Sequence, residues 1–211
     1  MRKAIIWDLD GVLVDSLGLR LAGLSNAASG AKAPHERDLR RWLCHGPRTA
    51  LRNIPGANTS LRDFERFCRS VASRYLTKFA GVGQTLESLD QLGVKQGLVT
   101  SRTTADTERW LNLCRVPTVF EARITYSDRL RPKPDPASLV AAADRLQVTT
   151  EESAYIGDTI EDGIACERAG MAFLLAGWGT PDADEVLAAV TPDGVLASPS
   201  DVLTWVQGGQ R

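Results

Sequence analysis

Hydrophobic and polar positions follow two different patterns along this chain of 211 residues. Short apolar runs alternate with stretches of helical spacing over 81–211, and one further apolar run lies at 4–7. Strand–helix alternation with short connections predicts an α/β fold with a doubly wound parallel sheet. We expect strands at 4–7, 96–100, 124–126, 153–157 and 172–175, helices at 84–92, 103–113, 136–146 and 160–169, and short elements at 185–189, 194–197 and 200–206.

Residues 17–80 carry no strand pattern. Apolar side chains recur there at helical spacing, and glycine and proline gather at the breaks, which fall at 30–34, 46–47 and 55–56. We therefore expect four short helices that form an α-helical cap, inserted into a discontinuous core made of 1–16 and 81–211. The pair Gly81 and Gly83 closes the insertion and is a candidate hinge. A frayed tail is expected at 207–211.

The first apolar run ends in two carboxylates one residue apart, Asp8 and Asp10. Ligands of an open parallel sheet bind outside the carboxyl ends of its strands, so these charges reach the expected binding crevice. Two such carboxylates favour a hard cation, and Mg²⁺ typically takes one or two carboxylates plus phosphate oxygens. A solvated pair of turn carboxylates is the alternative. A calcium loop of the EF-hand type is excluded, because its glycine and glutamate positions hold Leu13 and Leu19.

Polar groups follow two later strands as well. Thr100 and Ser101 come directly after an apolar strand and precede a helix. Their hydroxyl groups could form an anion site with the helix amides, and a simple helix N-cap is the alternative. Lys133 stands between two prolines in a stiff loop. Its ammonium could neutralise both a phosphoryl oxygen and a nucleophile, and an exposed loop lysine is the alternative.

The fourth group is a pair of aspartates near the strand expected at 153–157. Asp158 lies just past this strand, and Asp162 lies one helical turn further, on the same face of the next helix. Capping of that helix by Asp158 is the alternative to a functional role.

Composition excludes several classes of protein. Charged residues make up 24 %, hydrophobic residues 43 %, and the formal net charge is −1, so no basic excess indicates a nucleic-acid partner. No apolar run approaches the ~18 residues of a membrane helix, and Asp8 interrupts the first run too early for a secretory signal. We expect a cytoplasmic protein with reduced, buried thiols, because no CxxC pair occurs among Cys44, Cys68, Cys114 and Cys166.

These four groups occur in the order, and at the strand positions, of the four motifs of the haloacid dehalogenase superfamily of aspartate-nucleophile phosphatases. Residues 8–16, Asp-Leu-Asp-Gly-Val-Leu-Val-Asp-Ser, resemble its first signature. The likeness continues in Lys-Pro-Asp-Pro at 133–136 and in Gly-Asp-Thr-Ile-Glu-Asp at 157–162, so it covers the core from end to end. The chain is most similar to the subgroup with a helical cap after the first motif, typified by phosphoglycolate phosphatase and β-phosphoglucomutase.

The resemblance implies a Rossmann-like core and a Mg²⁺-dependent phosphoric monoester hydrolase that acts on a sugar phosphate, phosphoglycolate or a similar small metabolite. Asp8 would be the nucleophile that forms an aspartyl-phosphate. Asp10 would be the general acid and then the base, for which it needs a raised pKa or late proton transfer. Mg²⁺ would be held by Asp8, the main-chain carbonyl of Asp10 and Asp158, with Asp162 ordering the shell. The implied phosphate ligands are Thr100, Ser101 and Lys133.

The cap is expected to choose the substrate. In relatives, a glycine followed closely by a basic residue near the second cap helix often faces the active site, and here that pattern is Gly46-Pro47-Arg48. Arg48 could bind a substrate carboxylate or second phosphate in bidentate fashion, and a solvated helix arginine is the alternative. Arg20 is a weaker candidate for the same role.

Other functions stay open on the same fold. A phosphomutase of the β-phosphoglucomutase kind uses a cap histidine shortly after the first motif, and 17–20 contain none. Dehalogenase chemistry is disfavoured, because relatives that perform it lack the aspartate present here as Asp10. A non-catalytic binding module is the third alternative. The expected partner is a small phosphorylated molecule, without nucleic acid or membrane, bound by a monomer or homodimer.

Overall fold

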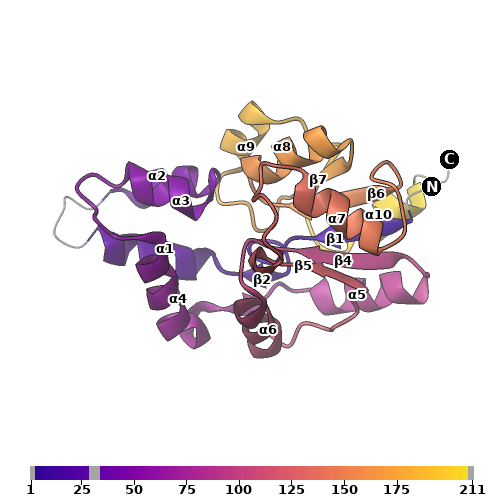
Figure 1. Ribbon diagram of the computed structural model, residues 1–211, viewed down its shortest axis with the longest axis horizontal. Helices are drawn as coiled ribbons and strands as arrows, with labels where there is room; N and C mark the ends of the chain where they lie inside the picture. Colours follow the sequence, from indigo (N-terminus) through magenta and orange to yellow (C-terminus); the bar gives the residue numbers. More distant parts are fainter. Residues whose placement is uncertain (1–2, 29–33, 209–211) are drawn as a thin grey trace.

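The computed structural model describes residues 3–28 and 34–208. The break expected at 30–34 and the tail expected at 207–211 lie mostly outside these ranges. Figure 1 shows a smaller helical group beside a larger part built on a sheet. Among the described residues, no helix combines the length and the apolar character needed to cross a membrane.

The larger part contains a six-stranded sheet in which every neighbouring pair of strands is parallel. Its strand order is β5-β4-β1-β6-β7-β8, so the chain winds outward from β1 first to one side and then to the other. The switch point therefore lies at β1, where such sheets bind their ligands. The strands are β1 (Ala4–Trp7), β4 (Lys95–Val99), β5 (Ala122–Ile124), β6 (Ser153–Gly157), β7 (Ala172–Ala176) and β8 (Gly194–Leu196).

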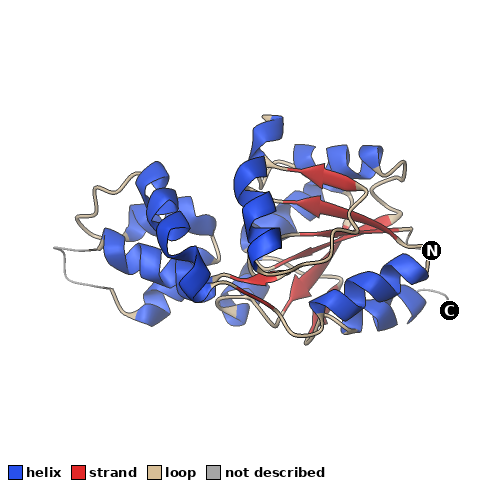
Figure 2. Ribbon diagram, turned by 90° about the horizontal axis from the view of Figure 1, so that it is seen from below, coloured by secondary structure: helices blue, strands red, loops and turns tan. Residues whose placement is uncertain are grey.

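Helices cover both faces of the sheet, as Figure 2 shows. Successive side chains of a strand point to opposite faces, so Trp7 packs in one hydrophobic cluster and Ile6 in another. The cluster of Trp7 includes residues of α5 (Val82–Gln91), α6 (Thr104–Leu113) and α10 (Asp201–Gly208). The cluster of Ile6 includes residues of α7 (Ala137–Arg145), α8 (Ile160–Ala169) and α9 (Ala183–Ala189). The predicted doubly wound α/β fold is confirmed.

The smaller part contains the four helices expected between the first strand and residue 80. Helix α1 packs against α4, and α2 packs against α3. Gly23 permits the close approach of α1 and α4, because a Cβ atom there would lie 2.5 Å from the ring of Phe64. The helices are α1 (Leu17–Ala27), α2 (Glu36–Leu43), α3 (Gly46–Asn53) and α4 (Leu61–Tyr75).

The two chain segments that join the parts lie side by side. Strands β2 (Val14–Asp15) and β3 (Thr77–Lys78) pair in antiparallel fashion, with Val14 opposite Lys78. Two residues per strand are too few for a visible alternation, so the sequence pattern did not predict this pair. We propose that the cap begins after β2 and ends before β3, which agrees at its start with the predicted boundary at 16–17.

One predicted strand is displaced. The strand expected at 124–126 lies at 122–124, because Thr125 and Asp128 form a capping box that starts a short 3₁₀ turn. The Thr125 hydroxyl accepts from the Ser127 amide at 3.2 Å, and Asp128 accepts from the Thr125 amide at 2.8 Å. The prediction that the cysteines are buried thiols is confirmed, since all four are free and buried.

Candidate active site

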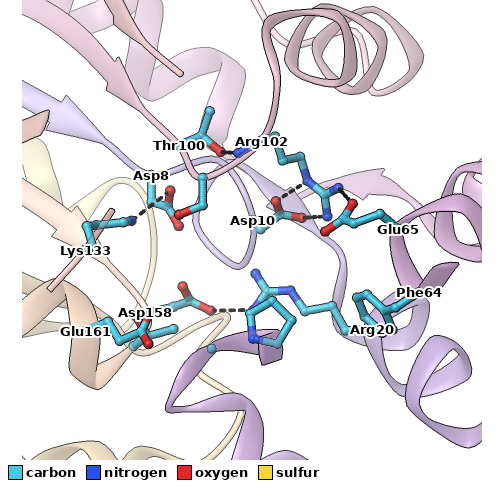
Figure 3. Close-up of a pocket in the computed structure, with 14 residues that line it drawn as sticks. Asp8, Asp10, Arg20, Phe64, Glu65, Thr100, Arg102, Lys133, Asp158 and Glu161 are labelled. Atoms are coloured by element: carbon cyan, nitrogen blue, oxygen red, sulfur yellow. Dashed lines mark hydrogen bonds and ion pairs between the residues drawn. The ribbon is translucent and has the colours of Figure 1, made fainter. Parts of the chain in front are cut away.

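A cavity of about 80 Å³ lies between the cap and the carboxyl ends of the central strands. Figure 3 shows that core and cap side chains converge on it from opposite sides. The core lining comprises Asp8, Asp10, Thr100, Ser101, Arg102, Lys133, Asp158, Thr159 and Glu161. The cap contributes Arg20, Gly46, Pro47, Phe64 and Glu65.

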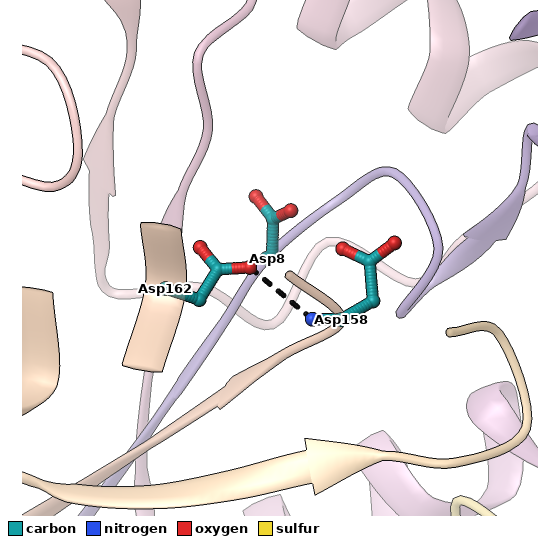
Figure 4. A group of neighbouring side chains, drawn as sticks. All are labelled: Asp8, Asp158 and Asp162. Carbon is teal, nitrogen blue, oxygen red and sulfur yellow. Dashed lines mark hydrogen bonds between the residues drawn. The ribbon is translucent and has the colours of Figure 1, made fainter. Parts of the chain in front are cut away.

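Three aspartates come together at this end of the sheet (Figure 4). Asp8 follows β1, Asp158 follows β6, and Asp162 lies in the first turn of α8; one oxygen of each lies within 4.8 Å of the others. Burial raises the pKa of Asp8 to about 6; Lys133 opposes this rise, while the charges of Asp162 and Asp10 add to it. Burial also raises the pKa of Asp158 well above its usual range, although the charge of Arg20 opposes the rise.

Asp158 has the chemistry of a cation ligand. Both of its carboxylate oxygens are buried and accept no hydrogen bond, although Arg20 Nη1 lies 3.7 Å from Oδ2. Helix α8 is capped by Thr159 and not by Asp158, so the capping alternative for Asp158 is excluded. Buried carboxylate oxygens without partners are costly unless a charge compensates them. With Asp8 beside them, they fit a hard divalent cation such as Mg²⁺.

Asp162 is already engaged by several donors. Its Oδ2 accepts from the Thr159 hydroxyl at 2.7 Å, from the Thr159 amide at 3.1 Å and from the Asp158 amide at 3.2 Å. Its Oδ1 accepts from Lys133 Nζ at 2.5 Å. These contacts fit the expected role of ordering the other ligands more closely than direct binding of a cation.

Lys133 reaches into the same cluster. Its side chain is 7 % exposed, so the alternative of a solvated loop lysine is excluded. Nζ lies 3.4 Å from Asp8 Oδ1 and donates to the Tyr155 hydroxyl at 2.8 Å. Although burial opposes it, the charges of Asp162 and Asp8 raise the pKa of Lys133, which therefore stays protonated beside the carboxylates.

Asp10 has a different environment from Asp8. Arg102 forms a bidentate ion pair with it: Nε donates to Oδ2, and Nη2 donates to Oδ1 at 2.9 Å. Burial alone would raise the pKa of Asp10, but the charges of Arg102 and then Arg20 lower it to about 2. This direction is opposite to the raised value that an acid at neutral pH requires. In the resting structure, Asp10 is therefore an ionised carboxylate.

The hydroxyl groups after β4 line the cavity. Thr100 is 5 % exposed, and its hydroxyl accepts from the Arg102 amide at 3.3 Å. Helix α6 is capped by Thr103, so Thr100 is not the N-cap that formed the alternative. Ser101 is exposed and also borders the cavity.

The two cap arginines have different positions. Arg20 on α1 lines the cavity, is 7 % exposed, and donates through Nε to the Ser16 hydroxyl at 3.1 Å. Arg48 on α3 is exposed and lines a separate surface hollow, although its charge lowers the pKa of Glu161. Its position favours the alternative of a solvated helix arginine, and Arg20 is the cap cation that meets the site.

Several lining residues were not singled out from the sequence. Arg102 directly follows Thr100 and Ser101, so its place in the second motif was a usable signal. Glu161 lies inside the stretch 157–162, and burial together with the charge of Asp162 raises its pKa to about 7. Phe64 and Glu65 lie on a predicted cap helix whose orientation no sequence signal defines.

Comparisons with known proteins show what this chain is similar to. The sequence model of the haloacid dehalogenase-like hydrolase family matches residues 5–176 of this chain. The chain is 28 % identical over 207 residues to the pyrophosphatase PpaX of Bacillus velezensis, covering 95 % of this chain and 94 % of the relative. It is 29 % identical over 213 residues to the phosphoglycolate phosphatase of Pseudomonas syringae pv. tomato, covering 90 % and 76 %.

A solved structure has the same fold. The HAD family hydrolase of Deinococcus radiodurans R1, which holds bound phosphate and sodium, superposes with a TM-score of 0.74. The alignment covers 98 % of this chain and 96 % of that one at 20 % identity, so it shows the fold alone.

Proposed function

The chain belongs to the haloacid dehalogenase-like hydrolase family, and from that premise we propose that it is a Mg²⁺-dependent phosphatase of small phosphorylated metabolites that acts through an aspartyl-phosphate. One observation carries the proposal. The buried oxygens of Asp158 accept no hydrogen bond beside the carboxylate of Asp8, and Lys133 Nζ lies 3.4 Å from that carboxylate. A nucleophile, a cation site and a fixed positive charge thus meet at the switch point of the sheet.

The reaction has two half-reactions. In the first, an Asp8 carboxylate oxygen attacks phosphorus, the bond to the leaving oxygen breaks, and that oxygen takes a proton from Asp10. In the second, a water oxygen attacks the aspartyl-phosphate, the phosphorus–Asp8 bond breaks, and Asp10 accepts the water's proton. Since Asp10 is ionised at rest, it is ready for the second role. A bound phosphoryl group would raise its pKa for the first role, because a nearby negative charge disfavours the ionised form.

The surrounding groups would position the phosphoryl group and neutralise its negative charge. Asp8, the Asp10 carbonyl and Asp158 would hold Mg²⁺, which when bound neutralises charge on phosphoryl oxygens and the nucleophile. Lys133 would bind one phosphoryl oxygen and keep Asp8 oriented, and the Thr100 hydroxyl would donate to another. Phosphoryl transfer needs this positioning and charge neutralisation more than further covalent chemistry.

The cavity supports a compact substrate. Its volume of about 80 Å³ is well below the ~300–1,000 Å³ of sites that take drug-sized ligands, so the cavity favours a small metabolite. Pyrophosphate and phosphoglycolate, for which two relatives are named, both carry a second anionic group. We propose that Arg20, the cap cation in the cavity, binds that group.

The phosphomutase alternative gains no support from the cap. Arg20 occupies the end of the stretch 17–20 in which a mutase of the β-phosphoglucomutase kind carries its histidine. The free, buried cysteines support a cytoplasmic protein, since thiols stay reduced there. A monomeric or homodimeric state stays a prediction.

A phosphate-release panel tests the proposal. Pyrophosphate, phosphoglycolate, sugar phosphates and nucleotides are incubated with the protein and Mg²⁺, with and without a chelator. We expect chelator-sensitive release from at least one compact substrate. Asp8→Asn should reduce it by roughly a thousandfold or more, because an amide cannot form the acyl-phosphate. Asp144→Asn, which changes an exposed aspartate of α7, is the matched control.

Two results would contradict the proposal. Release that persists in Asp8→Asn would exclude this nucleophile. Interconversion of a hexose 1-phosphate in the presence of a bisphosphate activator, without free phosphate, would establish the mutase instead.

A further inference from the structure

Arg102 has no part in the mechanism above, yet its guanidinium joins the two halves of the site. Its side chain is 9 % exposed. Nε and Nη2 bind the two oxygens of Asp10, and Nη1 donates to Glu65 Oε2 at 3.2 Å. Asp10 belongs to the core and Glu65 to cap helix α4, and Figure 3 shows the guanidinium between them. One planar cation is therefore divided between a core carboxylate and a cap carboxylate.

The position of Arg102 is fixed from other directions as well. Its Cζ lies 4.6 Å from the ring centroid of Trp110, a fully buried side chain of α6. Its amide donates to the Thr100 hydroxyl at 3.3 Å, and its carbonyl accepts from the Tyr126 amide at 2.8 Å. Stacking on an aromatic face and a rigid fork of donors are properties that arginine has and lysine lacks.

This contact holds the Asp10 carboxylate still without using all of its lone pairs. An ionised carboxylate has about four lone-pair sites, and a bidentate guanidinium takes one on each oxygen. A hydrogen bond with the Ser16 side chain uses a third site, which leaves one, and Asp10 lines the cavity. Arg102 thereby restricts rotation of the carboxylate about its Cβ–Cγ bond.

We propose that Arg102 is a positioning residue for the water-activating half-reaction. It orients the Asp10 carboxylate toward the water that hydrolyses the aspartyl-phosphate. Because Arg102 also binds Glu65, this orientation depends on the position of the cap. The inference rests on the proposed function. In that step the water's oxygen bonds to phosphorus, the bond from phosphorus to Asp8 breaks, and the water's proton passes to Asp10. A rotating carboxylate would be correctly oriented for only part of the time, and misplacement of such a group costs up to about a hundredfold in rate.

The test separates the two half-reactions with p-nitrophenyl phosphate, whose leaving group departs without needing a full proton. If only the second step slows, kcat falls while kcat/KM, which reports the first irreversible step, falls much less. For Arg102→Ala we expect kcat to fall roughly ten- to a hundredfold, with a parallel fall in KM. A burst of nitrophenol and phosphorylated Asp8, detected by mass spectrometry after acid quench, should accompany it.

Two further variants keep the test independent of folding. Arg102→Lys retains the charge but loses the fork, so we expect a smaller fall in kcat with the same burst. Glu65→Gln retains the contact between Arg102 and Asp10 but loses the negative charge on the cap side. We therefore expect kcat to fall by roughly two- to fivefold. Arg123→Ala is the control, because Arg123 binds Glu108 at 2.6 Å and does not line the cavity. It should change neither parameter.

The outcomes distinguish this inference from the function on which it rests. Equal falls of kcat and kcat/KM without a burst, in folded Arg102→Lys and Glu65→Gln, would refute the positioning role and leave the phosphatase intact. Unchanged kinetics in these variants would refute it as well. If the unmodified protein with Mg²⁺ hydrolyses neither p-nitrophenyl phosphate nor any member of the substrate panel, the proposed function fails and this inference fails with it.

Discussion

Two arginines of the cap show how far a single residue's role depends on its surroundings. Arg20 is buried and lies 3.7 Å from Asp158, whereas Arg48 is exposed on α3 outside the cavity. Arg20→Ala should reduce kcat/KM for a substrate with a second anionic group ten- to a hundredfold more than for p-nitrophenyl phosphate. A charge-assisted hydrogen bond is worth about 1.5–3 kcal/mol, which sets this range.

Arg48→Ala is the matched substitution for this prediction. The side chain of Arg48 faces solvent. We therefore expect the ratio of kcat/KM for the substrate with a second anionic group to kcat/KM for p-nitrophenyl phosphate to stay within about twofold of the ratio in the unmodified protein. A selective loss in Arg48→Ala that equals the loss in Arg20→Ala would show that the exposed arginine also reads the substrate.

Glu161 supports a prediction on pH. Burial, and then the charge of Asp162, raise its pKa from 4.5 to about 7 in the folded protein. The folded state thus binds more protons than the unfolded state between these values, so stability decreases as pH rises through the window. Glu161→Gln removes this penalty. In the metal-free protein it should be more stable than the unmodified chain by about 1–2 kcal/mol at pH 8, after allowance for solvent screening, and equal at pH 4.

Urea unfolding in the presence of a chelator, at pH 4 and at pH 8, measures this difference. An offset of the same size at both pH values would point to altered packing and would contradict the titration of Glu161 as the cause.

At the scale of an element, the loop between β1 and β2 depends on one glycine. Gly11 has φ +81°, and a Cβ atom there would lie 2.0 Å from Asp158 Oδ2. Gly93, just after α5, has φ +70° and nothing within 4 Å of its Cβ position. Gly93→Ala should therefore cost only the left-handed backbone strain, about 1–2 kcal/mol. Gly11→Ala should cost more, and should also weaken Mg²⁺ binding, because Asp158 has to move.

Denaturant midpoints and Mg²⁺ titrations of the two variants separate these effects. Similar stabilities, together with unchanged Mg²⁺ affinity in Gly11→Ala, would mean that the loop yields and that its contact with Asp158 does not constrain the site.

At the scale of the whole molecule, the cap also docks on the core beside α9. Arg41 Nε lies 2.8 Å and His45 Nε2 lies 3.3 Å from the carboxylate of Glu185, and the Ile160 amide donates to the Cys44 carbonyl at 2.9 Å. If these contacts favour the closed cap, Glu185→Ala should raise KM roughly two- to fivefold with less change in kcat. Exposed ion pairs contribute about 0.2–1 kcal/mol each, which limits the effect.

Glu36→Ala provides the comparison, because Glu36 pairs with Arg40 at 2.7 Å within α2 and does not bridge cap and core. Its KM should stay unchanged, and the effect of Glu185→Ala should shrink at high salt, where exposed charges are screened. A salt-independent rise in KM, or an equal rise in Glu36→Ala, would remove Glu185 from cap closure.

The sequence alone predicted the doubly wound sheet, the four cap helices and the core motifs. These features rest on local rules: strand and helix periods are visible in short windows, and the carboxyl ends of parallel strands share one edge of the sheet. Asp8, Thr100 and Asp158 therefore had to come together once the strands were assigned, and the structure places all three around one cavity. The order of the motifs added the expected roles.

Only the tertiary structure decided which cap residues meet the core. Arg102 contacts Glu65 and Asp10, partners 37 and 92 positions away, and this contact depends on how the cap is oriented over the sheet. No local period encodes that orientation. It follows from the packing of α1 on α4 and from the pairing of β2 with β3 at the chain crossings. The same packing buried Arg20 and left Arg48 in solvent, because a helical pattern marks the apolar face of a helix but not what that face will meet.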